Sequence, residues 1–168
     1  MPKFYKKFKP NEKLKKKINS DDLQKEVLSI LKNKVSERAS GNKNVGIFLS
    51  GGVDSTLILA LLRKIYPKKK IVTFTASFEN FKSKELIGEQ DAVKKICKYY
   101  NSRNIVVPIK SKDLIKNMGT YSSPETGILE YCNRALAKAA KLNGIDVVLS
   151  GEGSDEMFIG YDHNLSII

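Results

Sequence analysis

The feature that most constrains the fold of this chain is a set of short apolar runs that alternate with helical segments. The apolar runs cover residues 45–49, 71–76, 105–109 and 145–149, and turn residues flank them. Segments of helical length and periodicity, including residues 56–66, 85–100 and 127–142, lie between them. Strands that alternate with helices form parallel sheets through right-handed crossovers. We therefore predict an α/β fold, with a parallel β-sheet covered by helices on both faces.

An amphipathic helix is expected before the first strand, over residues 21–39, with Asp21 as its cap. Its apolar side chains recur at spacings of three and four, which places them on one face: Leu23, Val27, Ile30, Leu31 and Val35. Residues 1–20 form a lysine-rich basic arm, and residues 21–168 are taken as one domain. The arm contributes much of the net charge of +12. Because it offers few aromatic side chains for stacking on bases, we favour a solvated tail over a nucleic-acid contact.

Other classes of protein are disfavoured by composition. No apolar run approaches the roughly 18 residues of a membrane span, and no secretory signal pattern opens the chain. The two cysteines, Cys97 and Cys132, are far apart, and His163 is the one histidine, so no zinc cluster is expected. Reduced thiols and a cytoplasmic location are the expectation.

A glycine-rich loop directly follows the first predicted strand and precedes a helix. It reads Ser50-Gly51-Gly52-Val53-Asp54-Ser55. Consecutive glycines let the backbone approach an anion closely, and the N–H groups and dipole at a helix start hold phosphate. A carboxylate among phosphates is explained by a divalent cation between them. The loop predicts phosphate binding, although a plain Gly-Gly turn capped by Asp54 is the simpler alternative.

A second glycine-rich loop follows the fourth predicted strand and carries three acids. It reads Ser150-Gly151-Glu152-Gly153-Ser154-Asp155-Glu156. In parallel sheets, ligands bind beyond the carboxyl ends of the strands, where the strand order reverses. Both loops lie at such ends. Magnesium or a cationic substrate amine would explain the acids better than a solvated acidic turn does.

The first loop resembles the pyrophosphate-binding loop of the ATP-pyrophosphatase (PP-loop) superfamily. The stretch from Val147 to Tyr161, which contains the second loop, is similar to the asparagine synthetase signature. Residues 73–79 and 136–145 match in pattern as well, so the resemblance runs from about Leu31 to Tyr161. It implies a Rossmann-like, adenine nucleotide alpha-hydrolase-like fold and an ATP-pyrophosphatase domain that uses ATP and Mg2+.

The resemblance also implies roles for individual residues. Nucleotide binding is carried over to Phe48, Leu49, Ser50, Gly51, Gly52, Val53, Asp54, Ser55, Ala76, Ser150, Gly151 and Gly153. The metal ligands would be Asp54 and Asp155, and the catalytic set would be Glu152, Asp54 and Asp155. In that family, ATP and aspartate give β-aspartyl-adenylate and pyrophosphate. Ammonia then attacks to give asparagine and AMP, which makes the enzyme a carbon–nitrogen ligase of asparagine biosynthesis.

Several departures from the family pattern bear on function. Glutamine-hydrolysing members begin with a catalytic cysteine and a separate domain, whereas this sequence begins Met1-Pro2-Lys3. The family also continues with further helices beyond the position of Tyr161. We therefore expect ammonia from outside or a partner chain, either a glutaminase or one that supplies the C-terminal half. The alternatives are a non-catalytic or partner-dependent ATP-binding module, an amidating relative of the β-lactam synthetase type with another acceptor, and a tRNA-modifying enzyme.

Overall fold

The computed structural model describes residues 19–41, 43–78, 84–117 and 124–158, which contain four strands and six helices. The strands are β1 (Val45–Phe48), β2 (Val72–Phe78), β3 (Arg103–Ile109) and β4 (Val147–Leu149). The helices are α1 (Ser20–Ala39), α2 (Val53–Ile65), α3 (Lys84–Tyr99), α4 (Ser111–Asn117), α5 (Pro124–Leu142) and α6 (Ser154–Phe158). The predicted strands and the helices between them are confirmed. Helix α2 begins three residues earlier than expected, so part of the first glycine-rich loop is helical.

The four strands form one parallel sheet in the order β3-β2-β1-β4. The chain moves outward from β1 through β2 to β3, and then returns to place β4 on the other side of β1. The order therefore reverses at β1, between its two neighbours β2 and β4. Ligands of open parallel sheets bind beyond the carboxyl ends of the strands at this reversal. Both glycine-rich loops leave the sheet there.

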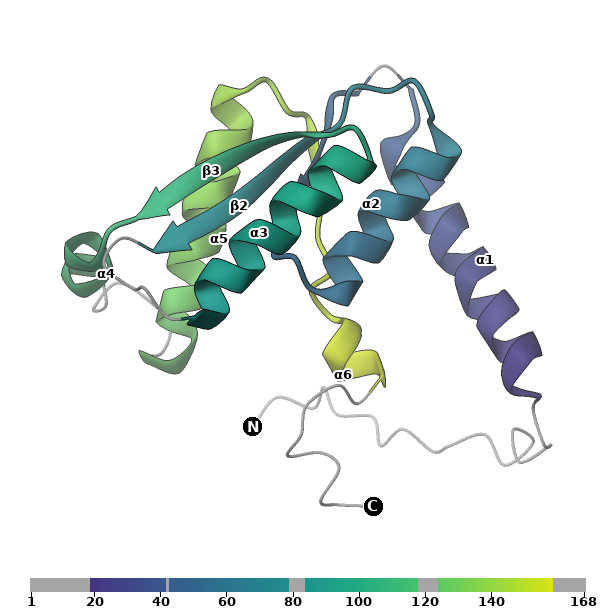
Figure 1. The fold of residues 1–168 in the computed structure, drawn as a ribbon, viewed down its shortest axis with the longest axis horizontal. Helices are drawn as coiled ribbons and strands as arrows, with labels where there is room; N and C mark the ends of the chain where they lie inside the picture. The colour runs from purple at the N-terminus through teal and green to yellow at the C-terminus, as the bar shows by residue number, and fades with distance from the viewer. Residues whose placement is uncertain (1–18, 42, 79–83, 118–123, 159–168) are drawn as a thin grey trace, which may run out of the picture.

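Helices cover both faces of the sheet, as predicted. In Figure 1, helices α1, α2 and α3 lie over one face, and α5 lies over the other. Each face has its own core. The first contains Ile47, Leu59, Leu62 and Val93, and the second is built around Phe74, Leu136 and Ala140. This layered arrangement leaves the carboxyl ends of β1 and β2 between α3 and α5. In the part of the chain that the structure describes, no helix is both long and apolar enough to cross a membrane.

Helix α1 departs from its predicted cap and its predicted buried face. Asn19 is the N-cap, and its side chain accepts a hydrogen bond from the Asp21 N–H at 3.2 Å, so the expected cap by Asp21 is wrong. Val35 is buried, but Leu23 and Ile30 are 45% and 53% exposed. Periodicity predicted the helix correctly. It did not predict that mainly the C-terminal half would be covered by its neighbours.

Arg63 joins the ends of three segments on the side of the sheet away from the glycine-rich loops. Its Nε donates to the Tyr100 carbonyl, and its Nη2 donates to the Asn101 carbonyl, at 2.8 and 2.7 Å. Its Nη1 donates to the carbonyls of Pro67 and Lys69, at 2.8 and 2.9 Å. One half-buried guanidinium therefore satisfies four backbone acceptors. This arrangement fixes the ends of α2 and α3 relative to β2 and β3.

We predict that Arg63→Met lowers the free energy of unfolding by about 2 kcal/mol, because several hydrogen bonds to a charged donor are lost together. Lys64→Met is the matched control. Lys64 is the neighbouring exposed cation, and we expect its loss to change stability by less than about 0.5 kcal/mol. Urea unfolding of both variants measures the difference. Equal stability of the two variants would contradict a structural role for Arg63.

Candidate nucleotide-binding site

The first glycine-rich loop requires glycine at position 51 for two physical reasons. Gly51 has a φ of 92°, which lies in the left-handed region that side chains disfavour. In addition, a Cβ atom there would lie 3.2 Å from both the Glu89 carbonyl oxygen and Val93 Cγ2. The loop is therefore packed closely against α3, and a side chain at position 51 would be strained and would have to displace its neighbours slightly.

Two serines hold the loop in shape from within. The Ser50 N–H donates to Ser55 Oγ at 3.3 Å, and the two hydroxyl oxygens are 3.2 Å apart. Ser50 Oγ accepts from the Gly52 N–H, while Ser55 Oγ donates to the Gly52 carbonyl. Ser55 is 5% exposed and braces the loop, whereas Ser50 is exposed. Of the two hydroxyls, that of Ser50 is the more accessible to a ligand.

The N-terminus of α2 emerges from this loop without a side-chain cap. Gly52 is the N-cap residue. As a glycine, it has no side chain that could accept a hydrogen bond from the first turn of the helix. The first N–H groups of a helix have no partner within the helix, and the macrodipole makes that end positive. A 13-residue helix that begins in this way is suited to bind an anion.

The second loop lies directly against the first turn of α2. A Cβ atom on Gly151 would lie 2.7 Å from the Ser55 nitrogen and 2.8 Å from Asp54 Cβ. Only glycine fits at this approach, which brings the loops after β1 and β4 into contact. Ser154 then starts α6, and its hydroxyl donates to the Gly151 carbonyl at 2.7 Å.

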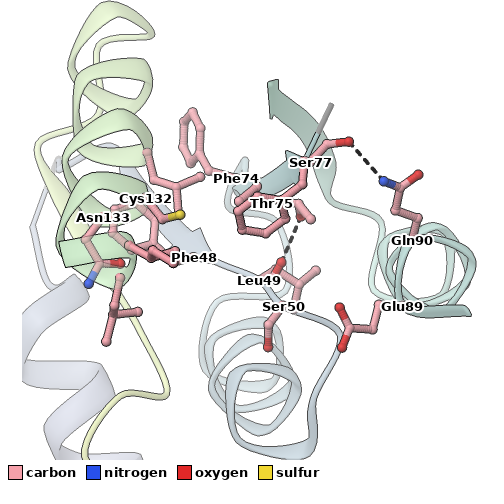
Figure 2. Close-up of a pocket in the computed structure, with 15 residues that line it drawn as sticks. Phe48, Leu49, Ser50, Phe74, Thr75, Ser77, Glu89, Gln90, Cys132 and Asn133 are labelled. Atoms are coloured by element: carbon pink, nitrogen blue, oxygen red, sulfur yellow. Dashed lines mark hydrogen bonds between the residues drawn. The ribbon is translucent and has the colours of Figure 1, made fainter. Parts of the chain in front are cut away.

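A cavity of about 440 Å3 opens beside these loops, between α3 and α5. Figure 2 shows Phe48, Cys132 and Asn133 on one side of it, and Glu89 and Gln90 on the other. The full lining is Phe48, Leu49, Ser50, Phe74, Thr75, Ala76, Ser77, Phe78, Glu89, Gln90, Ile128, Leu129, Cys132, Asn133 and Leu136. Two hydrogen bonds hold the floor of the cavity in place. The Leu49 N–H donates to the Phe74 carbonyl, and Thr75 Oγ1 donates to the Leu49 carbonyl.

The residues selected from the sequence fall into three groups. Four of them line the cavity: Phe48, Leu49, Ser50 and Ala76. The rest of the first loop, residues 51–55, is not part of the cavity lining and lies at the start of α2, where the Val53 side chain is 79% exposed. The second loop contributes Gly151 at the contact with α2. Gly153 has a φ of 94°, and a Cβ atom there would meet nothing within 4 Å, so this glycine serves the turn into α6.

Sequence reasoning missed the contribution of α3 and α5 to the cavity. From α5, Leu129, Cys132 and Leu136 face it at helical spacing, a signal that was visible in the apolar periodicity of residues 127–142. The polar residues carried no such signal. Gln90 donates to Ser77 Oγ at 3.0 Å, a bond drawn in Figure 2, and Asn133 Nδ2 lies 3.4 Å from Glu152 Oε1.

The three acids selected from the sequence lie on the two adjoining loops. Asp54 is in the first turn of α2, Asp155 is in the first turn of α6, and Glu152 precedes α6. Within the described residues, no group of three or more His, Cys, Asp or Glu side chains could hold a metal by itself. Magnesium on nucleotides needs only one or two carboxylates, because phosphate oxygens and waters complete its shell. Asp54 and Asp155, at the starts of α2 and α6, are the candidate ligands for such an ion.

Both cysteines are buried free thiols. Burial raises the pKa of Cys132 above its ordinary value, because desolvation disfavours the thiolate. Cys132 lines the cavity, whereas Cys97 lies in the core on the opposite face of the sheet. The pair therefore provides one thiol at the site and one away from it.

A helix N-terminus against a second glycine-rich loop, at the point where the strand order of a parallel sheet reverses, is the architecture of an α/β domain of the PP-loop type. The asparagine synthase family model matches residues 26–166. The chain belongs to this family.

Relatives in the family are much longer than this chain. It is 32% identical over 146 residues to the glutamine-hydrolysing asparagine synthetase 1 of Bacillus subtilis, which covers 84% of this chain and 22% of that protein. It is 29% identical over 145 residues to the glutamine-hydrolysing asparagine synthetase of Gallus gallus, covering 79% and 24%. The matched segment covers only 20% to 27% of the length of these relatives, so the chain spans about a quarter of the glutamine-hydrolysing synthetases that it matches.

Two solved structures share the fold. An NH3-dependent NAD synthetase from Campylobacter jejuni has a TM-score of 0.58 at 17% identity, over 86% of this chain and 61% of that one. A tRNA thiolase from Methanococcus maripaludis has a TM-score of 0.57 at 19% identity, over 86% and 55%. At these identities the likeness shows the fold alone.

We predict that Gly151→Ala weakens MgATP binding at least about tenfold, because the added methyl group would force the two loops apart. Gly144→Ala is the matched control. Gly144 also has a positive φ, of 69°, but it has open space around it and lies away from the cavity. We expect the control to lose about 1 kcal/mol of stability and no ATP affinity. Calorimetric titration measures both, and unchanged affinity in Gly151→Ala would contradict the loop contact.

We predict that MgATP protects Cys132 from iodoacetamide more than it protects Cys97. Alkylation of Cys132 should be slow at neutral pH and faster as the pH rises through its raised pKa, because the thiolate is the reactive form. Peptide mass spectrometry of timed samples gives both rates. Equal protection of the two thiols would show a global stabilisation instead of a ligand beside Cys132.

Proposed function

We propose that this domain binds MgATP and adenylates a carboxylate that a nitrogen nucleophile then attacks, with aspartate as acceptor and ammonia as nucleophile. The observation that carries the proposal is the contact of Gly151 with the first turn of α2. It places the acidic loop beside an uncapped helix N-terminus and a cavity of nucleotide size. Membership of the asparagine synthase family supports the reaction class.

The proposed binding roles are those that the family resemblance implies, and the cavity lining supports some of them. The purine ring would lie in the apolar cavity, against Phe48, Leu49 and Ala76. The phosphates would lie at the N–H groups of residues 51–55 and at the Ser50 hydroxyl, with Ser150 and Gly151 along the nucleoside. Asp54 and Asp155 would hold the magnesium. When bound, that ion neutralises the charge that builds on the leaving pyrophosphate.

In the chemical step, a carboxylate oxygen of the acceptor attacks the α-phosphorus of ATP. The bond from that phosphorus to the oxygen bridging the α- and β-phosphates breaks, and pyrophosphate leaves. Preorganised N–H donors at the start of α2 would stabilise the charge on the leaving group. Ammonia then attacks the acyl carbon and AMP departs. Glu152, at the edge of the site beside Asn133, would face the acyl group and the incoming amine.

The source of ammonia and the location of the protein are further parts of the proposal. We propose that ammonia comes from solution or from a glutaminase partner, since the matched relatives are glutamine-hydrolysing. Residues 1–18 of the predicted basic arm lie outside the described residues, and nucleic acid is not proposed as a ligand. The cytoplasm is the proposed location.

ATP–pyrophosphate exchange with magnesium tests the proposal. Exchange should depend on aspartate, and Asp54→Asn and Asp155→Asn should each reduce it at least about 100-fold while circular dichroism stays unchanged. Asp91→Asn is the control, because Asp91 is an exposed acid on α3 paired with Lys94. Normal exchange in either site variant would contradict the assignment. ATP binding without exchange would mean a module that needs a partner chain for turnover.

A further inference from the structure

The edge of the sheet opposite the glycine-rich loops is formed by the starts of the strands and the C-terminal ends of α1, α2, α3 and α5, along the upper part of Figure 1. Hydrogen bonds join these ends into one surface. Arg63 of α2 binds the carbonyls that follow α3. Lys69 Nζ donates to the Ala39 carbonyl at the end of α1, at 2.9 Å. Asn44 Nδ2 donates to the Gly144 carbonyl after α5, at 3.0 Å.

This surface is termed the basic face, because exposed cations lie on all the segments that form it. They are Arg38, Lys43, Lys64, Lys68, Lys70, Lys98, Arg103 and Lys141. None of these eight cations forms an ion pair with a described acid.

The described acids at the same end of the molecule are Glu37 and Asp146, and both are engaged within the chain. Glu37 pairs with Lys34 at 3.0 Å, and Asp146 Oδ2 accepts a hydrogen bond from the Asn44 N–H at 2.7 Å. The basic face therefore carries positive charge that the described part of the chain does not neutralise.

Stabilisation of helix ends does not account for these cations. A cation near a helix C-terminus interacts favourably with its carbonyls and dipole. At the basic face, Arg63 and Lys69 already have this role, because their partly buried side chains bind backbone carbonyls directly. The eight exposed cations form no side-chain hydrogen bond with another described residue. Their charge is directed to the surroundings of the protein.

The opposite end of the molecule, which contains the candidate site, has the opposite charge. Its acids lie on the glycine-rich loops, on the first turns that follow them and at the cavity: Asp54, Glu89, Glu152, Asp155 and Glu156. An acidic molecule is therefore attracted to the basic face and repelled from the loops. A partner bound at the basic face would leave the candidate site accessible.

The aromatic side chains of the basic face favour one class of acidic partner. Tyr99 is 81% exposed beside Lys98, and its ring lies edge-to-face with that of Tyr100, with the centroids 4.8 Å apart. The Tyr66 hydroxyl, by contrast, donates to the Ser36 carbonyl within the chain. Single-stranded nucleic acids bind to a series of stacking rings, and duplex DNA is read by a helix or ribbon that enters a groove. One exposed tyrosine among lysines is instead typical of a protein interface.

We propose that the basic face binds an acidic segment of a partner polypeptide. Carboxylates of the partner contact Lys68, Lys70 and Lys98, and an apolar or aromatic side chain of the partner packs on Tyr99. Exposed ion pairs are individually weak, so several act together and the affinity falls as salt is added. The inference is independent of the proposed function, because no residue of the candidate site takes part.

Carbodiimide crosslinking to an acidic peptide tests where such a segment binds. The probe is a synthetic peptide in which glutamates flank one phenylalanine, and carbodiimide joins its carboxylates to lysine amines. Peptide mass spectrometry of the full chain should find crosslinks at Lys68, Lys70 and Lys98. Crosslinks confined to the lysines of residues 3–17, or to Lys112 and Lys116 of α4, would overturn the inference.

Charge variants of the full chain separate the basic face from net charge. Fluorescence anisotropy of the labelled peptide should show about tenfold weaker binding when Lys68, Lys70 and Lys98 are all changed to Gln. The matched control changes the same number of exposed lysines elsewhere, Lys25, Lys112 and Lys116, and should lose less than about twofold. Equal losses in the two triple variants would overturn the inference, because they would report net charge alone.

Tyr99→Ser distinguishes a polypeptide partner from nucleic acid. This variant should bind the peptide about fivefold more weakly, because tyrosine at an interface supplies packing as well as charge complementarity. Its affinity for an oligouridylate RNA of equal charge should stay within about twofold of the unchanged chain, because no base stacks on Tyr99. Loss of RNA affinity with unchanged peptide affinity would overturn the proposal and identify the basic face as a nucleic-acid surface.

Discussion

The approach of Gly151 to the first turn of α2 is the contact on which the site depends. The Ser55 nitrogen would lie only 2.7 Å from any side chain placed at position 151, so the contact is backbone against backbone. It joins two loops that lie about a hundred residues apart in the chain. The parallel pairing of β1 with β4 makes the contact possible, because it brings both loops to the same edge of the sheet. Without that pairing, the acids of the second loop would have no fixed relation to the helix N-terminus.

The helices on the two faces of the sheet support this contact in different ways. On the first face, α2 and α3 bury the larger core, and Gly51 is pressed against α3 at Glu89 and Val93. On the second face, α5 packs on Phe74 through Leu136 and Ala140. Helix α3 therefore restricts the shape of the first glycine-rich loop, and α5 supplies a wall of the cavity. Rigid elements hold the loops, which a preorganised site requires.

Much of the fold, and the position of part of the candidate site, could be predicted from the sequence. The apolar runs predicted the four strands, because a parallel strand buried on both faces needs continuous apolar residues. The two glycine-rich loops could be identified from the sequence, and the structure brings them together through the close approach of Gly151 to α2. Phosphate binding at these loops stays a prediction. The α5 wall could not be predicted. Asn133 and Arg134 are polar residues within a helical pattern, and only the packing of α5 on the sheet shows which of them reach a cavity.

The same limit explains the errors at helix α1. Its apolar residues do recur at helical spacing, but spacing alone does not show how much of a helix other elements cover. Leu23 is 45% exposed. Its cap lay two residues earlier than expected, because the Asn19 side chain can accept the Asp21 N–H from outside the helix. Local pattern identifies an element, whereas tertiary contacts decide which residues of that element are used.

A crystal structure of the chain with magnesium and α,β-methylene-ATP would show whether the two glycine-rich loops form one nucleotide site. We expect phosphates at the N–H groups of residues 51–55, the base between Phe48 and Ala76, and Gly151 still in contact with α2. Phosphates bound away from the start of α2, or loops that separate when the nucleotide binds, would contradict this assignment.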